Sequence, residues 1–221
     1  MDDIKNTRSI TSIRIPHFGL EGTLGLPGSA HRGLVLFAHG SGSSRFSPRN
    51  NYVATALRKV GLATLLFDLL SESEERDRAN VFNIDLLADR LLAATDWARA
   101  SEVARSLPLA YFGASTGAAA ALVAAARRGD DISSVVSRGG RPDLAGDALA
   151  QVKAPTLLIV GGRDTEVLAL NRVALRALHC ESAIKTVPDA THLFEEPGAL
   201  DAVVKLAQNW FLGHLAPHAP G

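Results

Sequence analysis

The chain has 221 residues, of which 47% are hydrophobic and 21% are charged, and this balance excludes disordered and fibrous proteins. Its 23 basic and 23 acidic side chains cancel, so the sequence lacks the basic excess that is typical of nucleic-acid-binding proteins. The single cysteine, Cys180, excludes an intrachain disulfide framework, and no apolar run approaches the length of a membrane span. The acidic first residues lack an apolar segment, so we expect no secretory signal there. We therefore expect one cytoplasmic domain over residues 1–221, with a frayed tail at about residues 215–221. We expect a monomer or homodimer that binds neither nucleic acid nor membranes.

Short apolar segments alternate with longer segments of helical spacing along the chain. Residues 9–17 and 20–26 meet at Gly19 and predict an antiparallel hairpin at one edge of a sheet. The strands expected after it are apolar without a strict period of two, which is typical of parallel strands covered on both faces. They are residues 33–38, 62–67, 109–112, 132–136 and 156–160, and residues 183–187 are expected to form the last strand.

The segments between these strands have the features of helices, and they are residues 48–60, 84–98, 116–128, 165–178 and 197–212. The first follows Ser47-Pro48, an N-cap residue with proline at the first helical position, and ends before Gly61. The second repeats apolar residues on one face, which indicates packing against a sheet. The alternation predicts an α/β fold with an eight-stranded, mainly parallel sheet and helices on both faces.

The connection after residues 109–112 reads Gly113-Ala114-Ser115-Thr116-Gly117, a G-x-S-x-G pattern that leads into a helix. A serine on such a sharp strand-to-helix turn exposes its Oγ, and only small neighbours allow the backbones to approach so closely. The N-terminus of the helix also favours negative charge developing nearby. A five-residue pattern also arises by chance, and the alternative is a glycine-rich turn with an incidental serine. The strand before it and the helix after it favour a nucleophile.

A serine nucleophile needs a base, and the base is oriented by an acid. Asp164 comes after the second-last predicted strand, and His192 comes after the last. Because ligands bind at the carboxyl ends of parallel strands, we expect Ser115, Asp164 and His192 to meet there as a catalytic triad. Taken singly, Asp164 is equally typical of an exposed or helix-capping turn and His192 of a surface loop. Asp68 is a weaker candidate for the acid because it precedes the serine.

A glycine-rich and serine-rich loop, His39-Gly40-Ser41-Gly42, follows residues 33–38. An acyl intermediate carries an oxyanion that needs hydrogen-bond donors. We expect the backbone N–H groups of Thr116 and Ser41 to supply them, and we prefer Ser41 to Gly42. We expect His39 to be structural, with its ring bonded to the loop backbone.

These motifs resemble the α/β-hydrolase superfamily, and most of all its small, lidless members grouped as dienelactone-hydrolase-like proteins. The residues that carry the resemblance are His39-Gly40-Ser41-Gly42, Gly113-Ala114-Ser115-Thr116-Gly117, Gly161-Gly162-Arg163-Asp164 and Thr191-His192-Leu193-Phe194. The resemblance implies the triad order Ser, Asp, His. Dienelactone hydrolase itself uses a cysteine nucleophile, and the serine in this chain points instead to an ordinary ester as substrate.

Only residues 137–155 separate the two strands between which larger relatives insert a helical cap, so we expect an open site without a cap domain. The candidate substrate-binding residues around it are Gly42, Arg45, Phe46, Leu69, Leu70, Phe82, Arg138, Leu193 and Phe194. The apolar ones suit an acyl or alcohol group. Arg45 and Arg138 either bind a substrate carboxylate or pair with glutamates in residues 72–75. Residues 72–78 are expected to form a solvated, mobile loop.

The sequence therefore predicts a serine hydrolase that cleaves carboxylic esters through an acyl-enzyme intermediate. The remaining histidines match no metal-binding spacing, so we expect neither a metal nor another cofactor. Acyl transfer, amide cleavage and perhydrolysis on the same triad are alternatives. A non-catalytic binding protein on a hydrolase scaffold is an alternative from a different class.

Overall fold

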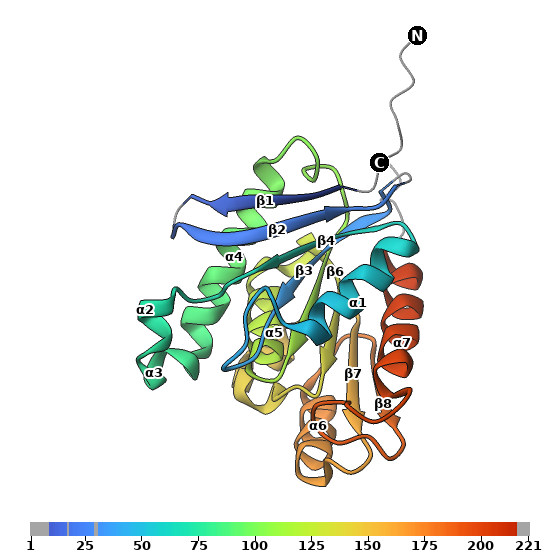
Figure 1. Cartoon of the computed structure of the whole chain (residues 1–221). Coiled ribbons are helices and arrows are strands. Elements are labelled where there is room, and N and C mark those ends of the chain that lie inside the picture. Colours follow the sequence, from blue (N-terminus) through green and yellow to red (C-terminus); the bar gives the residue numbers. More distant parts are fainter. Residues whose placement is uncertain (1–8, 17, 29–30, 216–221) are drawn as a thin grey trace.

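One mixed sheet forms the centre of the computed structural model, which describes residues 9–16, 18–28 and 31–215 (Figure 1). Its strands are β1 (Ser9–Ile15), β2 (Leu20–Leu26), β3 (Gly33–Ala38), β4 (Leu62–Phe67), β5 (Leu109–Ala114), β6 (Ile132–Arg138), β7 (Thr156–Gly161) and β8 (Ser182–Val187). The eight strands lie in the order β1-β2-β4-β3-β5-β6-β7-β8. The β1–β2 and β2–β4 pairs are antiparallel, and all other neighbours are parallel. The predicted sheet with an N-terminal antiparallel hairpin is confirmed.

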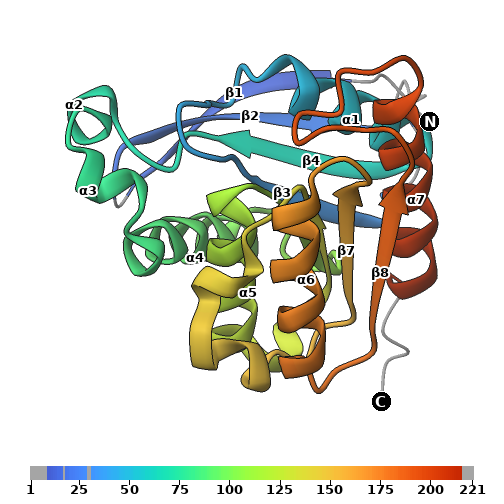
Figure 2. The same cartoon turned by 90° about the horizontal axis from the view of Figure 1, so that it is seen from below.

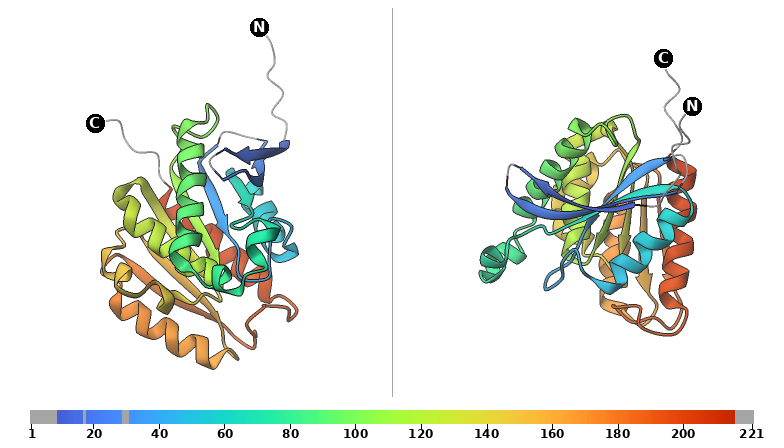
Figure 3. Two further views of the ribbon diagram at one scale, coloured as in Figure 1. Left: turned by 90° about the vertical axis from the view of Figure 1, so that its left-hand side faces the viewer. Right: turned by 45° about the horizontal axis from the view of Figure 1, so that its top comes forward.

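Helices cover both faces of this sheet, as Figures 2 and 3 show. The helices are α1 (Pro48–Lys59), α2 (Glu72–Glu75), α3 (Arg78–Val81), α4 (Ile84–Ala100), α5 (Thr116–Arg128), α6 (Thr165–Ala177) and α7 (Ala199–His214), with 3₁₀ segments η1 (Gly129–Asp131) and η2 (Pro142–Gln151). Helices α1 and α7 pack on one face, and α4, α5 and α6 pack on the other. Each face has its own buried apolar core, because each strand in the middle of the sheet sends alternate side chains to opposite faces.

The alanine-rich helix α5 packs tightly against the sheet, and its predicted bounds are confirmed. All its residues from 116 to 125 are buried, because alanine side chains let a helix backbone approach the strands beneath it. The approach is closest at Gly117, where a Cβ atom would lie 2.2 Å from the carbonyl oxygen of Ala38. The start of α5 therefore lies against the end of β3.

The carboxyl ends of the central parallel strands are aligned at one edge of the sheet. Ala38 pairs with Gly113, Ala114 pairs with Arg138, and Arg138 pairs in turn with Ile159. Because the strands end together, the loops after β3, β5, β6 and β7 meet at this edge. Residues 139–155, all of them described, contain only η2, so no cap domain covers the edge from the β6–β7 connection.

The segment after β4 differs from the prediction. Residues 72–78 are not a mobile loop but form α2 and the start of α3. Ser71 and Glu74 form a capping box at the start of α2, and Glu74 also pairs with Arg90 at 2.5 Å. The capping-box pattern can be read from the sequence, but the many charges of residues 72–78 favoured the prediction of a loop.

The two predicted ends of the chain are only partly described. Residue 17 of the expected first strand and residues 216–221 of the expected tail lie outside the described residues. Leu215, which the prediction places at the start of the tail, is 4% exposed and packs into the core on the α7 face. Among the described residues, no helix has the length and apolar character needed to cross a bilayer.

Candidate active site

Ser115 occupies a strained turn between β5 and α5. Its backbone angles are φ 51° and ψ −124°, a conformation that a residue with a side chain rarely adopts. The turn is possible because its neighbours are small: a Cβ atom at Gly113 would lie 2.4 Å from the Cα of Ala118, and one at Gly40 would lie 2.7 Å from the Cβ of Ser115. Although Ser115 stands at the N-cap of α5, its side chain makes no capping hydrogen bond. The hydroxyl is therefore not occupied by the helix that it precedes.

Asp164 and His192 form a hydrogen bond of 2.7 Å between Oδ2 and Nδ1. Asp164 stands at the N-cap of α6, but its carboxylate makes no capping bond and faces the imidazole instead. The two loops are brought together by their backbones, because the Arg163 N–H donates to the Ala190 carbonyl at 2.9 Å. A Cβ atom at Gly161 would lie 2.4 Å from that same carbonyl oxygen, so the approach requires glycine there.

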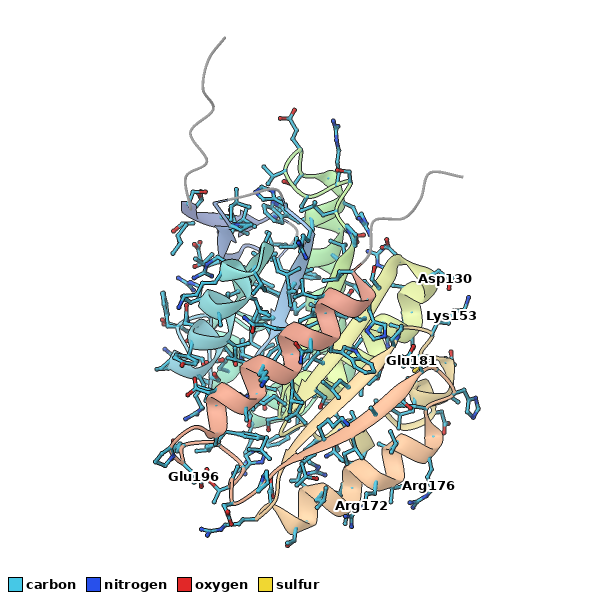
Figure 4. All side chains as sticks on the ribbon, turned by 90° about the vertical axis from the view of Figure 1, so that its right-hand side faces the viewer. Asp130, Lys153, Arg172, Arg176, Glu181 and Glu196 are labelled. Carbon is cyan, nitrogen blue, oxygen red and sulfur yellow. The ribbon has the colours of Figure 1, made fainter. Side chains whose placement is uncertain are left out.

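The loop that carries His192 is fixed by a carboxylate further along. The Thr191 N–H donates to Glu196 Oε1 at 3.1 Å, and this hydrogen bond lowers the pKa of Glu196. Figure 4 shows Glu196 in the loop that leads into α7. The backbone on either side of His192 has positive φ at Asp189 and Phe194, which indicates a tightly turned loop.

Ser115 and His192 line the same pocket, which has a volume of about 230 Å³. The residues that line it are Gly40, Ser41, Ser43, Ser47, Arg49, Ala114, Ser115, Arg138, Gly139, His192 and Leu193. The His192 ring lies over Gly139, where a Cβ atom would approach its Cε1 to 3.7 Å. Among the described residues no hydrogen bond joins Ser115 to His192, and in ligand-free enzymes such bonds are often long and shorten only when substrate binds.

The two predicted oxyanion donors are neighbours in the structure. The Ser41 N–H donates to the Thr116 Oγ1 at 3.1 Å, across 75 positions of the sequence. Thr116 is 3% exposed, at the first position of α5. The Thr116 hydroxyl therefore fixes the loop peptide beside the nucleophile, and it takes up the Ser41 N–H in doing so.

His39 is structural, as predicted. Its Nδ1 lies 3.0 Å from the Gly40 carbonyl, and its Nε2 accepts the Leu69 N–H at 2.9 Å. An acceptor at Nε2 places the proton on Nδ1, so the ring is neutral. Burial lowers the pKa of His39, in agreement with this assignment. The ring ties the β3 loop to the β4 loop, and both of its nitrogens are occupied.

The candidate substrate-binding residues fall into three groups. Arg138 and Leu193 line the pocket with Ser115. Gly42, Leu69 and Leu70 line a much smaller adjoining cavity, and Phe194 is buried at 2% exposure beneath the site. Arg45, Phe46 and Phe82 do not line the pocket, and the two aromatic rings are 68% and 49% exposed.

The arginines have different partners from those expected. Arg45 pairs with Asp68 and lies over the Phe46 ring, with 4.3 Å between the guanidinium carbon and the ring centroid. The predicted pairing of Arg45 with glutamates in residues 72–75 is therefore wrong. The same partnership removes Asp68 as a partner for His192. Arg138 pairs with no carboxylate of the described residues.

Three residues that were not predicted from the sequence also line the pocket: Ser43, Ser47 and Arg49. The sequence contained one indication that Arg49 is unusual: it is a basic residue in the first turn of α1, where the helix dipole favours acidic residues. Ser47 was interpreted only as the N-cap of that helix. It does cap α1, but it also lines the pocket.

A comparison with protein families decides the classification. Residues 31–207 match the model of a family described as an alpha/beta hydrolase domain. The chain belongs to the α/β-hydrolase family. The eight-stranded, mainly parallel sheet with its N-terminal antiparallel hairpin agrees with this classification.

Individual relatives add detail. The crystal structure of a dienelactone hydrolase from Anabaena variabilis ATCC 29413 is 54% identical, with a TM-score of 0.89 over 94% of this chain and 98% of that chain. Est1E from Butyrivibrio proteoclasticus is 16% identical with a TM-score of 0.78 over 93% of this chain and 98% of that chain, and it shares the fold. Two Mycobacterium tuberculosis proteins with provisional phosphoribosyl transferase names are each 60% identical over 189 residues. The match covers 86% of this chain and 43% of theirs, so this chain spans less than half the length of those two relatives.

The described residues outside the pocket were expected to bind no metal, and they contain one cysteine, Cys180. No group of three or more His, Cys, Asp or Glu side chains in the described part of the chain could hold a metal ion. Cys180 is half-buried, and burial raises the pKa of its thiol, which reduces the thiolate fraction.

Proposed function

We propose that this α/β hydrolase is a serine esterase that cleaves carboxylic esters through an acyl-enzyme intermediate. The observation that carries the proposal is the 2.7 Å Asp164–His192 hydrogen bond at a pocket that Ser115 also lines. Because Asp164 holds Nδ1 of the imidazole, Nε2 is the nitrogen left to act as the base. The strained backbone of Ser115 and its uncapped hydroxyl support its role as the nucleophile.

In the first half-reaction, Ser115 Oγ attacks the ester carbonyl carbon while its proton passes to His192 Nε2. Asp164 orients the ring and stabilises the imidazolium that forms, without taking the proton itself. The tetrahedral intermediate then collapses: the bond between the carbonyl carbon and the leaving oxygen breaks, and that oxygen receives the proton from Nε2. The products are the free alcohol and an ester of Ser115.

In the second half-reaction, His192 removes a proton from water, which attacks the acyl-enzyme. Collapse of the second intermediate releases the acid and returns the proton to Ser115 Oγ. In both intermediates we assign the oxyanion to the N–H groups of Thr116 and Ser41, each contributing about 2.7–4 kcal/mol. The Ser41 amide bonds to the Thr116 hydroxyl in the free protein, so it must turn or share its hydrogen when the oxyanion forms.

The phosphoribosyl transferase names do not change this proposal. They belong to proteins of which the matched segment is 43%, whereas the dienelactone hydrolase is matched over 98% of its length. We therefore assign ester hydrolysis, and not phosphoribosyl transfer, to this chain.

The direct test replaces Ser115 by alanine and measures hydrolysis of p-nitrophenyl acetate. We expect Ser115→Ala to lose nearly all turnover and all covalent labelling by a fluorophosphonate probe, with an unchanged circular dichroism spectrum. Ser106→Ala is the matched control, because Ser106 lines a pocket formed at the other end of the sheet. Turnover by Ser115→Ala at near the wild-type rate would show that another group is the nucleophile.

Two further measurements separate the alternatives. Product analysis in the presence of competing alcohols, amines or hydrogen peroxide distinguishes hydrolysis from acyl transfer and perhydrolysis, and anilide substrates test for amide cleavage. A wild-type protein that neither labels with fluorophosphonate nor turns over any ester would be a binding protein on the hydrolase scaffold.

A further inference from the structure

Arg138 is a buried cation without an anionic partner. It is the last residue of β6, is 8% exposed, and lines the pocket with Ser115 and His192. Its Nη2 reaches only the neutral Asn50 Oδ1, at a long 3.5 Å, and its buried Nε has no hydrogen-bond partner among the described residues. The nearest aromatic ring, that of Phe194, has its centroid 5.9 Å from the guanidinium carbon. None of these contacts neutralises the charge.

A second arginine increases the positive charge of this pocket. Arg49 lines the same pocket from the first turn of α1, and its buried Nε also has no partner among the described residues. Its Nη1 pairs with Glu195 at 2.9 Å, so among the described residues the two arginines have one carboxylate partner between them, and that partner belongs to Arg49. Burial and the nearby Arg49 charge lower the pKa of Arg138 to about 10, which leaves Arg138 protonated at neutral pH.

Such an arrangement costs stability in the free protein. A buried charge without a partner is destabilising, and arginine is normally found paired when buried. The other pocket-facing groups provide donors, because the side chains of Ser43 and Ser47 also line the cavity. The site thus presents several hydrogen-bond donors and excess positive charge around a small space next to the nucleophile.

We propose that Arg138, assisted by Arg49, forms an anion subsite that selects esters carrying a carboxylate or phosphate group close to the bond that is cleaved. The proposal rests on the proposed esterase function. The group must be near the scissile ester because Arg138 and Ser115 share a pocket of only about 230 Å³. A planar guanidinium can bind either anion through two parallel hydrogen bonds, and Nε, which has no partner, belongs to one such edge.

The test compares three methyl esters of similar length by pH-stat titration: methyl butanoate, monomethyl succinate and methyl 3-phosphonopropanoate. We expect wild-type kcat/KM to be higher for one or both anionic esters than for methyl butanoate. In Arg138→Met this preference should fall by about tenfold to a hundredfold, the range typical of a lost charge-assisted hydrogen bond. Arg138→Lys should recover part of it, because lysine retains the charge but not the fork geometry.

The matched control is Arg172→Met, which removes the same charge from an exposed position on α6. Figure 4 shows Arg172 directed away from the sheet. We expect this variant to keep the wild-type preference. An unchanged anionic-to-neutral ratio in Arg138→Met, or an equal fall in Arg172→Met, would overturn the subsite.

A binding measurement separates failure of the subsite from failure of the esterase proposal. In Ser115→Ala, which cannot turn over, succinate and inorganic phosphate are titrated by thermal shift and calorimetry. We expect one of them to raise Tm, and we expect Ser115→Ala/Arg138→Met to show no shift while being at least as stable without anion. An Arg138-dependent shift without ester turnover would leave the subsite standing and reject the esterase. Ester turnover by the wild type without an Arg138-dependent Tm shift or substrate preference would support the esterase and reject the subsite.

Discussion

The two ends of the sheet hold pockets of opposite character. At the amino ends of β3, β5 and β6, a pocket of about 630 Å³ contains Arg99, which donates to Asp131 and to the backbone of Leu107. Asp130 in the same pocket pairs with Lys153 at 2.9 Å. At the carboxyl ends, the pocket of about 230 Å³ contains strained Ser115 and unpaired Arg138.

The difference shows which features indicate chemistry. In the larger pocket Arg99, Asp131 and Asp130 have partners of opposite charge, as expected where charges serve the fold. The smaller one keeps a strained turn and an unmatched charge, both of which cost stability in the free protein. In this molecule the candidate site is therefore distinguished by features that are unfavourable for folding and not by cavity size.

The largest effect is expected when the Asp164–His192 pair at the carboxyl-end pocket is broken. Asp164→Asn should lower kcat for p-nitrophenyl acetate by about 10³- to 10⁴-fold, because an amide no longer selects the productive imidazole tautomer. Asp130→Asn, at the opposite end near Lys153 (Figure 4), should leave kcat unchanged. Steady-state kinetics with active-site titration measure both.

Equal losses of kcat in the two variants would mean that the carboxyl-end pocket is no more important for catalysis than the amino-end pocket. A loss in Asp164→Asn of tenfold or less would indicate that another group orients His192.

The next effect concerns the glycine that lets α5 begin against β3. A Cβ atom at Gly117 would lie 2.2 Å from the Ala38 carbonyl oxygen, and backbone must move to admit it. We expect Gly117→Ala to lower the free energy of unfolding by about 2–3 kcal/mol and to impair activity by displacing the serine turn. Urea unfolding gives the first quantity.

Gly213 in α7 is the control for this substitution, because a Cβ atom there would meet nothing within 4 Å. Gly213→Ala should stabilise the protein by about 0.5–1 kcal/mol through helix propensity. If Gly117→Ala were equally harmless, close packing would not be what requires glycine in the turn.

Local patterns were sufficient to predict the fold and the position of the candidate triad. The bounds of α5 follow from an alanine run that ends in glycine, and β3, β4, β5 and β7 are apolar runs followed by small or polar residues. Because parallel strands end at one edge, the order of Ser115, Asp164 and His192 was enough to place them together. Their hydrogen bonding was not predictable, because it depends on the exact course of the loops.

Contacts between side chains of distant loops could not be predicted from the sequence. Arg45 and Arg138 were equivalent candidates for a substrate carboxylate. Arg45 has Asp68 opposite it, whereas Arg138 ends β6 next to the neutral Asn50. Nothing in the local pattern distinguishes them, because the partners come from other elements: Asp68 from the loop after β4 and Asn50 from α1.

A smaller effect is expected at the hydroxyl that fixes the oxyanion loop. Thr116→Val removes the acceptor of the Ser41 N–H but keeps the shape of the side chain. If the hydroxyl positions the loop, kcat should fall by about tenfold, less than the loss of an oxyanion donor itself, with little change in KM.

Thr116→Ser, which keeps the hydroxyl, should restore most of the activity. A fall of the same size in both variants would assign the effect to lost packing of the methyl group and not to the hydrogen bond.

The smallest effect is a pH dependence of stability that originates at His39, in the small cavity that adjoins the carboxyl-end pocket. Burial lowers the pKa of His39 in the folded state, so the unfolded chain binds a proton that the folded chain does not. The slope of unfolding free energy with pH is then positive: stability is complete above the unfolded value of about 6.5 and is lost as pH falls below it. Between pH 7.5 and 5.5 this group should account for about 1 kcal/mol.

His39→Gln tests the assignment by urea unfolding at both pH values. The variant is expected to be less stable at pH 7.5, because glutamine cannot reproduce both ring contacts with Gly40 and Leu69. Its stability should nevertheless change less between the two pH values than that of the wild type. The same pH dependence in both proteins would mean that His39 takes up its proton in the fold as readily as in the unfolded chain. The neutral ring could then not be what ties the β3 loop to the β4 loop beside the nucleophile.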